Sequence, residues 1–325
     1  MTRLVVTTAA LCLAIGVAAA DTPPPLRVGI IGLDTSHVVA FTALLNKDAK
    51  GPLENIRVVA AFPGGSPDLP ISADRLAGFT ATLRDKHGVE IVGSIAALVK
   101  KVDVVLLESV DGRVHLEQAR PVIEAGKPLF IDKPVAASLA DTLAIYDLAA
   151  KHKVPCFSSS SLRFNTRLQG LATSPAVGPV RQCDATGPVS PLKGHPELFF
   201  YGIHGIEMLF TVLGPGCETV TWKDGVVTGT WTGGRVGTFR PDKTYRVKVT
   251  GARGNADSGG GDYAGLVRAI AVFFRTGKPP VTAAETIALV AFMEAAEASK
   301  QAGGKPVTIA EVTRRARAEL ARRSQ

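Results

Sequence analysis

The stretch LRVGIIGLDTSHVVAFTALL, residues 26–45, decides the fold class of this chain. Its first seven residues form a short apolar run that ends at Gly32, which is typical of a buried parallel strand. Polar residues follow at 34–37, and apolar residues then recur at helical spacing from Val38 to Leu45. The stretch therefore predicts a strand that is followed directly by a helix.

The same alternation of strands and helices continues to residue 157. Further strands are expected at 56–62, 90–92, 102–107, 129–131 and 154–157, and helices at 116–125 and 138–152. Strands that alternate with helices predict a doubly wound parallel sheet of the Rossmann type. We assign this nucleotide-binding-like domain to residues 21–158.

Strands cluster instead of alternating beyond the serine run at 158–161. They are expected at 180–185, 219–222, 226–231, 236–239 and 245–250, with helices at 201–212, 263–274 and 283–301. This order predicts an α+β domain with a mostly antiparallel sheet at residues 159–325. We expect it to form the substrate site and possible contacts between copies of the chain. The fold class is therefore α/β, with a Rossmann-type domain followed by an α+β domain.

Composition restricts the classes of partner. Of 325 residues, 46% are hydrophobic and 20% charged, which is the composition of a globular chain. The net charge is +8, and residues 313–325 carry five Arg against one Glu, which favours a solvated basic helix face. Aromatic residues make up only 6%, so stacking platforms for a single-stranded nucleic acid are not expected. We predict a small-molecule partner and no nucleic acid.

Residues 1–20 have the pattern of a cleaved export signal. Arg3 precedes an apolar stretch from Leu4 to Val17, and three alanines at 18–20 form a small-residue cleavage site. The sequence predicts a periplasmic or secreted protein that is not in the membrane after cleavage; the alternative is an uncleaved N-terminal anchor. Three cysteines remain at 156, 183 and 217, without zinc-ligand spacing, and we expect no disulfide.

The turn after the first strand departs from the usual phosphate-binding pattern. Rossmann folds carry G-x-G-x-x-G there, so that the backbone and a helix N-terminus can hold a pyrophosphate. Gly32 is kept, but Asp34 and His37 occupy the other two positions. A carboxylate at 34 hinders close approach of the backbone and repels a diphosphate. The acid expected near the end of the second strand is replaced by FPGGS at 62–66.

Later segments resemble a known enzyme family. They are VDVVLL at 102–107, His115, EAGKPLFIDKP at 124–134, SLRF at 161–164, GIHGIE at 202–207 and LG at 213–214. Together they resemble the Gfo/Idh/MocA oxidoreductases, whose Glu-Lys-Pro motif stands here as Asp132-Lys133-Pro134. The resemblance implies oxidation of a sugar or polyol with NAD or NADP. It also implies a cofactor site formed by Gly32, Leu33, Asp34, Thr35, Ser36, His37, Asp132, Lys133 and Pro134.

The resemblance also implies the reacting groups. By similarity, Lys133 and His204 face the nicotinamide and the substrate hydroxyl, and either group can accept the hydroxyl proton. Tyr201 is a further catalytic candidate, although core packing or stacking on the substrate remains open for it. Substrate-binding candidates are His115, Arg163, Tyr201 and His204. Relatives often have an Asp four residues before the histidine, where this chain has Phe200.

Structural alternatives stay open for these side chains. Lys133 could pair with Asp132 or Glu108, His204 could be a satisfied core histidine, and His115 could cap a helix. Arg163 could bind substrate or a phosphate. For Asp34 and His37 we consider polar packing and capping of the following helix through Asp34 or Thr35 first. Contact with a sugar or an altered cofactor comes second, and a metal site with Glu108 and Asp111 third.

Two functions remain in view. The first is an NAD- or NADP-dependent oxidoreductase acting on a sugar or polyol. The alternative is an exported non-redox relative, either a sugar-binding protein or a lyase or hydrolase, with a degenerate dinucleotide site. A weaker third possibility is a partner subunit for an active homologue. Self-association through the C-terminal sheet is also predicted.

Overall fold

The computed structural model describes residues 25–47 and 51–323, so the predicted export signal at 1–20 lies outside the described residues. The first half of the chain forms a parallel sheet of six strands in the order β3-β2-β1-β4-β5-β6. These strands are β1 (Leu26–Ile31), β2 (Ile56–Phe62), β3 (Glu90–Ile91), β4 (Val104–Leu107), β5 (Leu129–Ile131) and β6 (Cys156–Ser158). The predicted Rossmann-type sheet is therefore confirmed.

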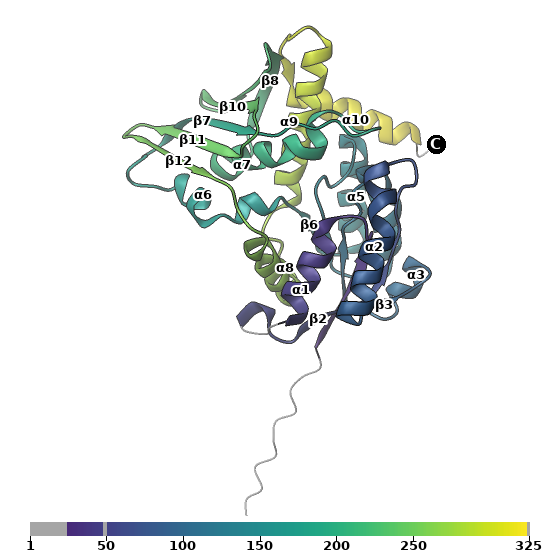
Figure 1. Ribbon diagram of the computed structural model, residues 1–325. Coiled ribbons are helices and arrows are strands. Elements are labelled where there is room, and N and C mark those ends of the chain that lie inside the picture. The colour runs from purple at the N-terminus through teal and green to yellow at the C-terminus, as the bar shows by residue number, and fades with distance from the viewer. Residues whose placement is uncertain (1–24, 48–50, 324–325) are drawn as a thin grey trace, which may run out of the picture.

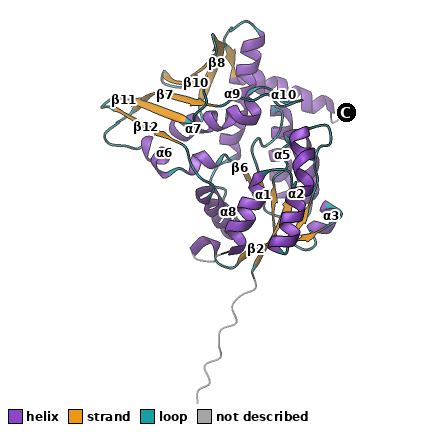
Figure 2. Ribbon diagram, viewed as in Figure 1, coloured by secondary structure: helices purple, strands orange, loops and turns teal. Residues whose placement is uncertain are grey.

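Helices cover this sheet (Figure 2). They are α1 (Ser36–Lys47), α2 (Pro70–His87), α3 (Ile95–Leu98), α4 (His115–Glu124) and α5 (Leu139–His152), with short 3-10 turns η1 (Gly51–Leu53), η2 (Gly112–Val114) and η3 (Ser161–Phe164). Sequence analysis missed α2. Only Ser72 and Leu83 of its 18 residues are buried, so α2 shows almost no apolar stripe.

The second half forms a seven-stranded sheet in the order β12-β11-β7-β10-β9-β8-β13, at the upper left of Figure 1. Its pairs are antiparallel except for the parallel pair of β7 and β10. The strands are β7 (Val180–Gly187), β8 (Cys217–Lys223), β9 (Val226–Trp231), β10 (Arg235–Pro241), β11 (Arg246–Gly251), β12 (Asn255–Gly259) and β13 (Val307–Thr308). A mostly antiparallel sheet is confirmed; self-association through it stays a prediction.

The helices of this half are α6 (Thr166–Leu171), α7 (Ile203–Leu213), α8 (Ala264–Thr276), α9 (Ala283–Gln301) and α10 (Ile309–Arg323), and a π-helical turn, η4 (Leu198–Gly202), leads into α7. The basic stretch near the C-terminus is α10. Its Arg317 and Arg323 form ion pairs with Asp147 and Asp141 of α5, which accounts for part of the basic excess.

Helix α8 belongs to the second half of the sequence but packs on the first sheet, beside α1 (Figure 1). Its apolar side chains join one core cluster with residues of β1, β2 and β4. Phe273 is fully buried and meets the ring of Phe157 on β6 edge to face, with centroids 4.8 Å apart. This contact attaches α8, from the second half of the chain, to the parallel sheet of the first half.

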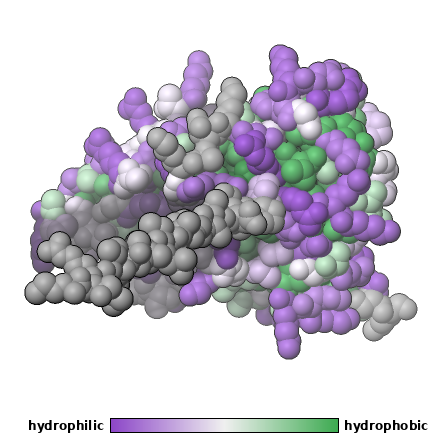
Figure 3. Space-filling view, turned by 90° about the horizontal axis from the view of Figure 1, so that it is seen from below, coloured by the Kyte–Doolittle hydropathy of each residue, from purple (hydrophilic) through white to green (hydrophobic). Residues whose placement is uncertain are grey.

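Cys156, Cys183 and Cys217 are free and buried. Burial raises the pKa of the Cys156 and Cys217 thiols to about 12, so both stay protonated and unreactive at neutral pH. Within the described parts of the chain, no helix is long and apolar enough to cross a membrane. The face seen from below mixes many polar side chains with smaller apolar areas (Figure 3).

We expect Phe273→Ala to destabilise the protein by about 3–5 kcal/mol, because it removes a fully buried ring between α8 and β6. The measurement is the free energy of unfolding in urea. Val272→Ala, one residue earlier and 44% exposed, is the matched control and should change stability by no more than about 0.5 kcal/mol. Equal effects of the two substitutions would contradict the packing described for α8.

Candidate active site

A pocket of about 540 Å³ lies where the carboxyl ends of the parallel strands meet the second sheet. Ligands of doubly wound folds bind outside this edge of the sheet. The first half of the chain contributes Thr35–His37 at the start of α1, Arg75, Val110, Asp132 and Lys133. The second half contributes Ser161, Leu162, Phe200, Tyr201, His204, Tyr245 and residues 260–263. The pocket thus gathers cationic, imidazole and phenol groups from distant parts of the sequence.

Lys133 lies at the wall of this pocket, directly after β5. Its Nζ is 3.5 Å from the carbonyl oxygen of Phe200 and lies over the rings of Phe200 and Tyr201, at 5.3 and 5.6 Å from their centroids. Burial lowers the pKa of Lys133, and the neighbouring carboxylate of Asp132 opposes that change. A lysine with a lowered pKa exchanges its proton more readily, as acid–base chemistry requires.

His204 faces the same pocket from α7. Its Nδ1 lies 2.6 Å from the hydroxyl oxygen of Ser160, which also accepts a hydrogen bond from the backbone N–H of Leu162. Burial lowers the pKa of His204 well below its ordinary value, and the positive charge of Lys133 adds to this. The imidazole is therefore neutral at neutral pH. In the tautomer in which Nδ1 donates to Ser160, Nε2 can accept a proton.

His37 is a third basic group at the pocket, held by a buried carboxylate. Its Nδ1 is 2.6 Å from Oδ2 of Asp132, and its ring stacks on Phe41 and meets the edge of Tyr263. Burial alone would raise the pKa of Asp132, but the neighbouring His37 and Lys133 outweigh it and lower the pKa, so the carboxylate is ionised. A carboxylate that orients an imidazole is typical of histidines that act as acids or bases.

Glu108 directly follows β4 and lies near Asp132. It is fully buried, and neither carboxyl oxygen has a hydrogen-bond partner among the described residues. Burial raises the pKa of Glu108 well above its ordinary value, and the charge of Asp132 raises it further. Glu108 is therefore a neutral carboxylic acid and does not form the ion pair with Lys133 that the sequence left open.

Two predicted substrate contacts need correction. His115 is fully buried and its ring nitrogens lie 3.2 and 2.8 Å from the carbonyl oxygens of Val135 and Ser109, so it joins two loops. Arg163 is 8% exposed and pairs with Glu207 and Glu285. Neither side chain lines the pocket. Both residues follow polar or loop segments in the sequence, and only the fold reveals that their partners are internal.

The predicted phosphate loop is divided between two environments. Gly32, Leu33 and Asp34 are buried, whereas Thr35, Ser36 and His37 line the pocket. Thr35 caps α1, since its Oγ1 accepts the backbone N–H of His37 at 3.1 Å. Gly32 has a φ of 85°, and a Cβ there would lie 2.2 Å from Oγ of Ser109, so the loops after β1 and β4 are in direct contact.

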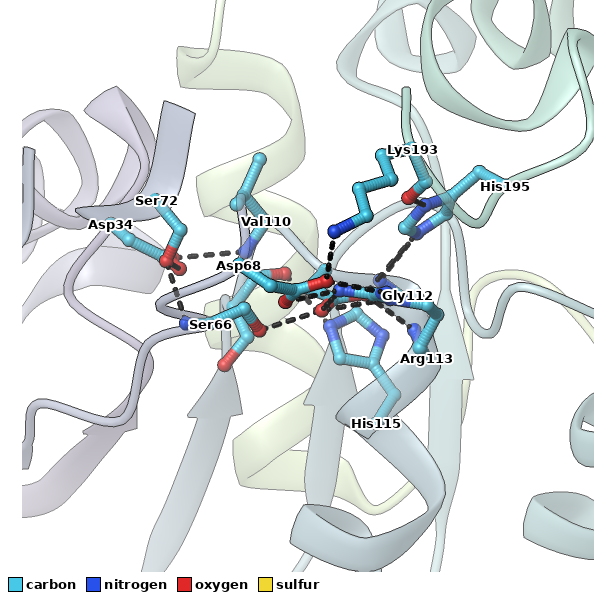
Figure 4. A network of polar contacts seen from close by, with 12 residues as sticks. Asp34, Ser66, Asp68, Ser72, Val110, Gly112, Arg113, His115, Lys193 and His195 are labelled. Carbon is cyan, nitrogen blue, oxygen red and sulfur yellow. Dashed lines mark hydrogen bonds and ion pairs between the residues drawn. The ribbon is translucent and has the colours of Figure 1, made fainter. Parts of the chain in front are cut away.

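The side chain of Asp34 crosses from the loop after β1 to other elements (Figure 4). Its carboxylate accepts the backbone N–H of Val110 at 2.9 Å and the hydroxyl of Ser72 at 2.6 Å. Its pKa is raised, since burial outweighs these hydrogen bonds. The predicted polar packing therefore describes Asp34, while the capping belongs to Thr35. In the described ranges, no group of three or more His, Cys, Asp or Glu could hold a metal ion.

Further polar contacts join the loops after β2 and β4 (Figure 4). Ser66 donates to Asp111 at 2.6 Å, and Arg113 pairs with Asp111 and Asp68, each at 2.8 Å. Lys193, from the loop before η4, reaches Asp68 at 3.3 Å. We call Asp34, Ser66, Asp68, Ser72, Asp111 and Arg113 the polar bridge.

Comparison with known families gave a match for the first domain. Residues 26–160 match the model of the Gfo/Idh/MocA family, described as the oxidoreductase family with an NAD-binding Rossmann fold. The first domain of this chain is therefore similar to the Rossmann domain of that family. The comparison with curated proteins gave no match.

Solved structures support the fold over most of the chain. A probable dehydrogenase from Thermotoga maritima is 19% identical with a TM-score of 0.72, over 88% of this chain and 100% of that one. Scyllo-inositol dehydrogenase from Lactobacillus casei, solved with NAD(H) and scyllo-inositol, is 14% identical with a TM-score of 0.71, over 88% and 99%. Myo-inositol 2-dehydrogenase from Lactobacillus plantarum is 15% identical with a TM-score of 0.71, over 87% and 99%.

A whole dinucleotide does not fit the residues present. In this fold it crosses the crevice between the loops after β1 and β4, with its adenosine toward the end of β2. The polar bridge joins those three loops to one another. The open pocket reaches Thr35–His37 at the start of α1, Val110 and Arg75, and extends from there past β5 to the second sheet.

We expect the ring of His204 to remain neutral as the pH falls through 6.5, because burial lowers its pKa well below that value. Since the unfolded chain then binds more protons than the folded one, His204 should cause stability to decrease as the pH falls below 6.5. Heteronuclear NMR of the histidine rings measures this, with His204→Gln identifying the signals. A ring that protonates at or above pH 6.5 would contradict the described burial.

Proposed function

We propose that this protein binds a small carbohydrate or polyol in the pocket and exchanges a proton with one of its hydroxyl groups. The observation that carries the proposal is that Lys133 and His204 face one pocket with their pKa values lowered by burial. The match of residues 26–160 to an oxidoreductase family supports chemistry at a carbon that bears a hydroxyl. Structural neighbours that are inositol dehydrogenases support the substrate class.

The remaining lining suits a polyhydroxylated ligand. The hydroxyl of Tyr245 is buried without a partner among the described residues, so it can hydrogen-bond a ligand. Tyr201 is 37% exposed and offers both a ring face and a hydroxyl. His204 accepts the proton of a ligand hydroxyl at Nε2, and the Lys133 ammonium stabilises the negative charge that develops on that oxygen.

Two versions of the proposal differ in whether electrons are transferred. The first is oxidation of the hydroxyl-bearing carbon with NAD or NADP, which the family and its NAD-bound structural neighbours support. The second is redox-neutral: a sugar-binding protein, or a lyase or hydrolase that uses the same acid–base groups. The polar bridge favours the second version, because it occupies the crevice that the first version needs.

We expect Lys133→Met and His204→Gln each to lower kcat/KM by about a hundredfold to ten-thousandfold, the range for loss of a general acid or base. Monosaccharides, sugar acids and inositols should be screened by NMR, which detects redox and redox-neutral conversion alike. Lys151→Met removes an exposed lysine on α5 and should leave the rate unchanged. Full activity in both pocket variants would overturn the proposal.

We also propose that the protein is exported, on the pattern of residues 1–20. N-terminal sequencing of the mature protein from the periplasmic or secreted fraction should begin at Asp21. Recovery from the cytoplasm with Met1 or Thr2 at the N-terminus would contradict export. A variant with Leu11→Arg and Leu13→Arg, which interrupts the apolar stretch, should remain in the cytoplasm.

A further inference from the structure

The crevice that the fold offers to a dinucleotide begins between β1 and β4, where the strand order reverses. A pyrophosphate there needs close approach to the backbone at the first βα turn, and the adenosine needs an open surface toward the end of β2. The two requirements involve the loops at 32–37, 62–69 and 108–113. The structure describes all three loops, and the contacts between them determine whether a dinucleotide has room to bind.

Asp34 closes the part of the crevice at the first βα turn, where the pyrophosphate would lie. It stands at the second glycine position of the usual motif, is fully buried, and joins Val110 after β4 to Ser72 in the first turn of α2. Ser72 in turn accepts the backbone N–H of Ser66 at 2.8 Å. One carboxylate therefore fixes the loops after β1, β2 and β4 relative to one another.

Charged groups close the part of the crevice toward the end of β2, where the adenosine would lie. Arg113 forms hydrogen bonds with both oxygens of Asp111 and both oxygens of Asp68. Arginine and carboxylates pair strongly in this geometry. The contacts with Arg113 lower the pKa of Asp68 to about 2, so it remains ionised at neutral pH. A dinucleotide entering here would have to separate Arg113 from the carboxylates of Asp68 and Asp111.

A loop from the second half of the chain covers this part of the crevice. Nε2 of His195 accepts the backbone N–H of Gly112 at 3.0 Å, and burial lowers the pKa of His195, which keeps it neutral for this role. A Cβ at Gly194 would lie 2.9 Å from the side chain of Arg113. The loop at 193–195 therefore packs directly on the bridge.

The polar bridge and the pocket differ in whether their buried polar groups lack a hydrogen-bond partner. Among the described residues, no buried side-chain atom of the polar bridge lacks a partner. At the pocket, by contrast, the hydroxyl of Tyr245 is unpartnered. Buried polar groups without partners are costly, so they mark places where a ligand can supply hydrogen bonds. The polar bridge offers no such group, whereas the pocket does.

We infer that the polar bridge replaces the adenosine and pyrophosphate of a dinucleotide, so that this chain binds its ligand in the pocket without NAD or NADP. Hydrogen bonds and ion pairs among the residues of the polar bridge hold these loops together. This inference goes beyond the proposed acid–base function, which concerns Lys133 and His204 and does not depend on it.

The test is calorimetric titration of the full mature chain with NAD, NADH, NADP and NADPH. We expect no saturable binding to the native sequence at millimolar dinucleotide. The double variant Asp34→Gly with Arg113→Ala should gain affinity for NADH by at least about tenfold, because it reopens the crevice and restores a glycine. Micromolar binding by the native chain would overturn the inference. So would a folded double variant that gains no affinity.

The matched control is Asp224→Gly with Arg120→Ala. Asp224 lies in an exposed turn with a φ of 50°, which glycine tolerates, and Arg120 is exposed on α4. This variant should bind no better than the native chain. Equal gains in the two double variants would show that the bridge is not what excludes the dinucleotide.

A measurement on the native chain covers the case in which the double variant does not fold. The N–H groups of Val110 and Gly112 donate to Asp34 and His195, so their hydrogen exchange reports whether the bridge is closed. We expect their protection and chemical shifts to be unchanged by millimolar NADH. Loss of protection at both amides, with matching shifts at Lys133, would overturn the inference. Neither outcome bears on the rates of the Lys133 and His204 variants.

Discussion

The buried carboxylate of Asp132 is the interaction on which the candidate active site depends. One oxygen holds the ring of His37, and the other accepts the backbone N–H of Lys133 at 2.8 Å. It is ionised although buried, because these two neighbours compensate for its burial. Burial raises the pKa of Glu108, and the charge of Asp132 raises it further; the same charge limits how far the pKa of Lys133 falls. Without it the orientation of His37 and the charge of Lys133 would both change.

The sequence predicted the first sheet because its strands are short apolar runs, several of which are followed by a recognisable helix. It missed α2, whose buried side is limited to Ser72 and Leu83, since periodicity detects a helix only where an apolar face exists. It also did not foresee that α8 packs on the first sheet. Nothing local in 264–276 specifies which of two apolar surfaces the helix covers.

The sequence drew attention to residues that carry a recognisable motif and gave no sign of partners that are distant along the chain. Lys133 and His204 meet at one pocket, as the resemblance implied, and Tyr201 lies beside them. Arg163 looked equally available in the sequence. Its guanidinium instead pairs inside the protein with Glu207 and Glu285, which lie 44 and 122 residues away in the sequence. Ser160 and Tyr245 were missed for the same reason, because neither forms a motif with the groups it contacts.

The two replaced glycines have opposite consequences, and this distinction joins the fold to the proposed chemistry. Asp34 turns inward and ties together the loops that a dinucleotide would separate, while His37, three residues later, turns toward the pocket and is held by Asp132. Asp34 precedes α1 and His37 lies in its first turn, so the two side chains reach different neighbours. A loop that had merely lost its glycines would leave an open, poorly packed crevice. Here the replaced positions are buried or oriented by specific partners, which is the arrangement expected of a site that has exchanged one ligand for another.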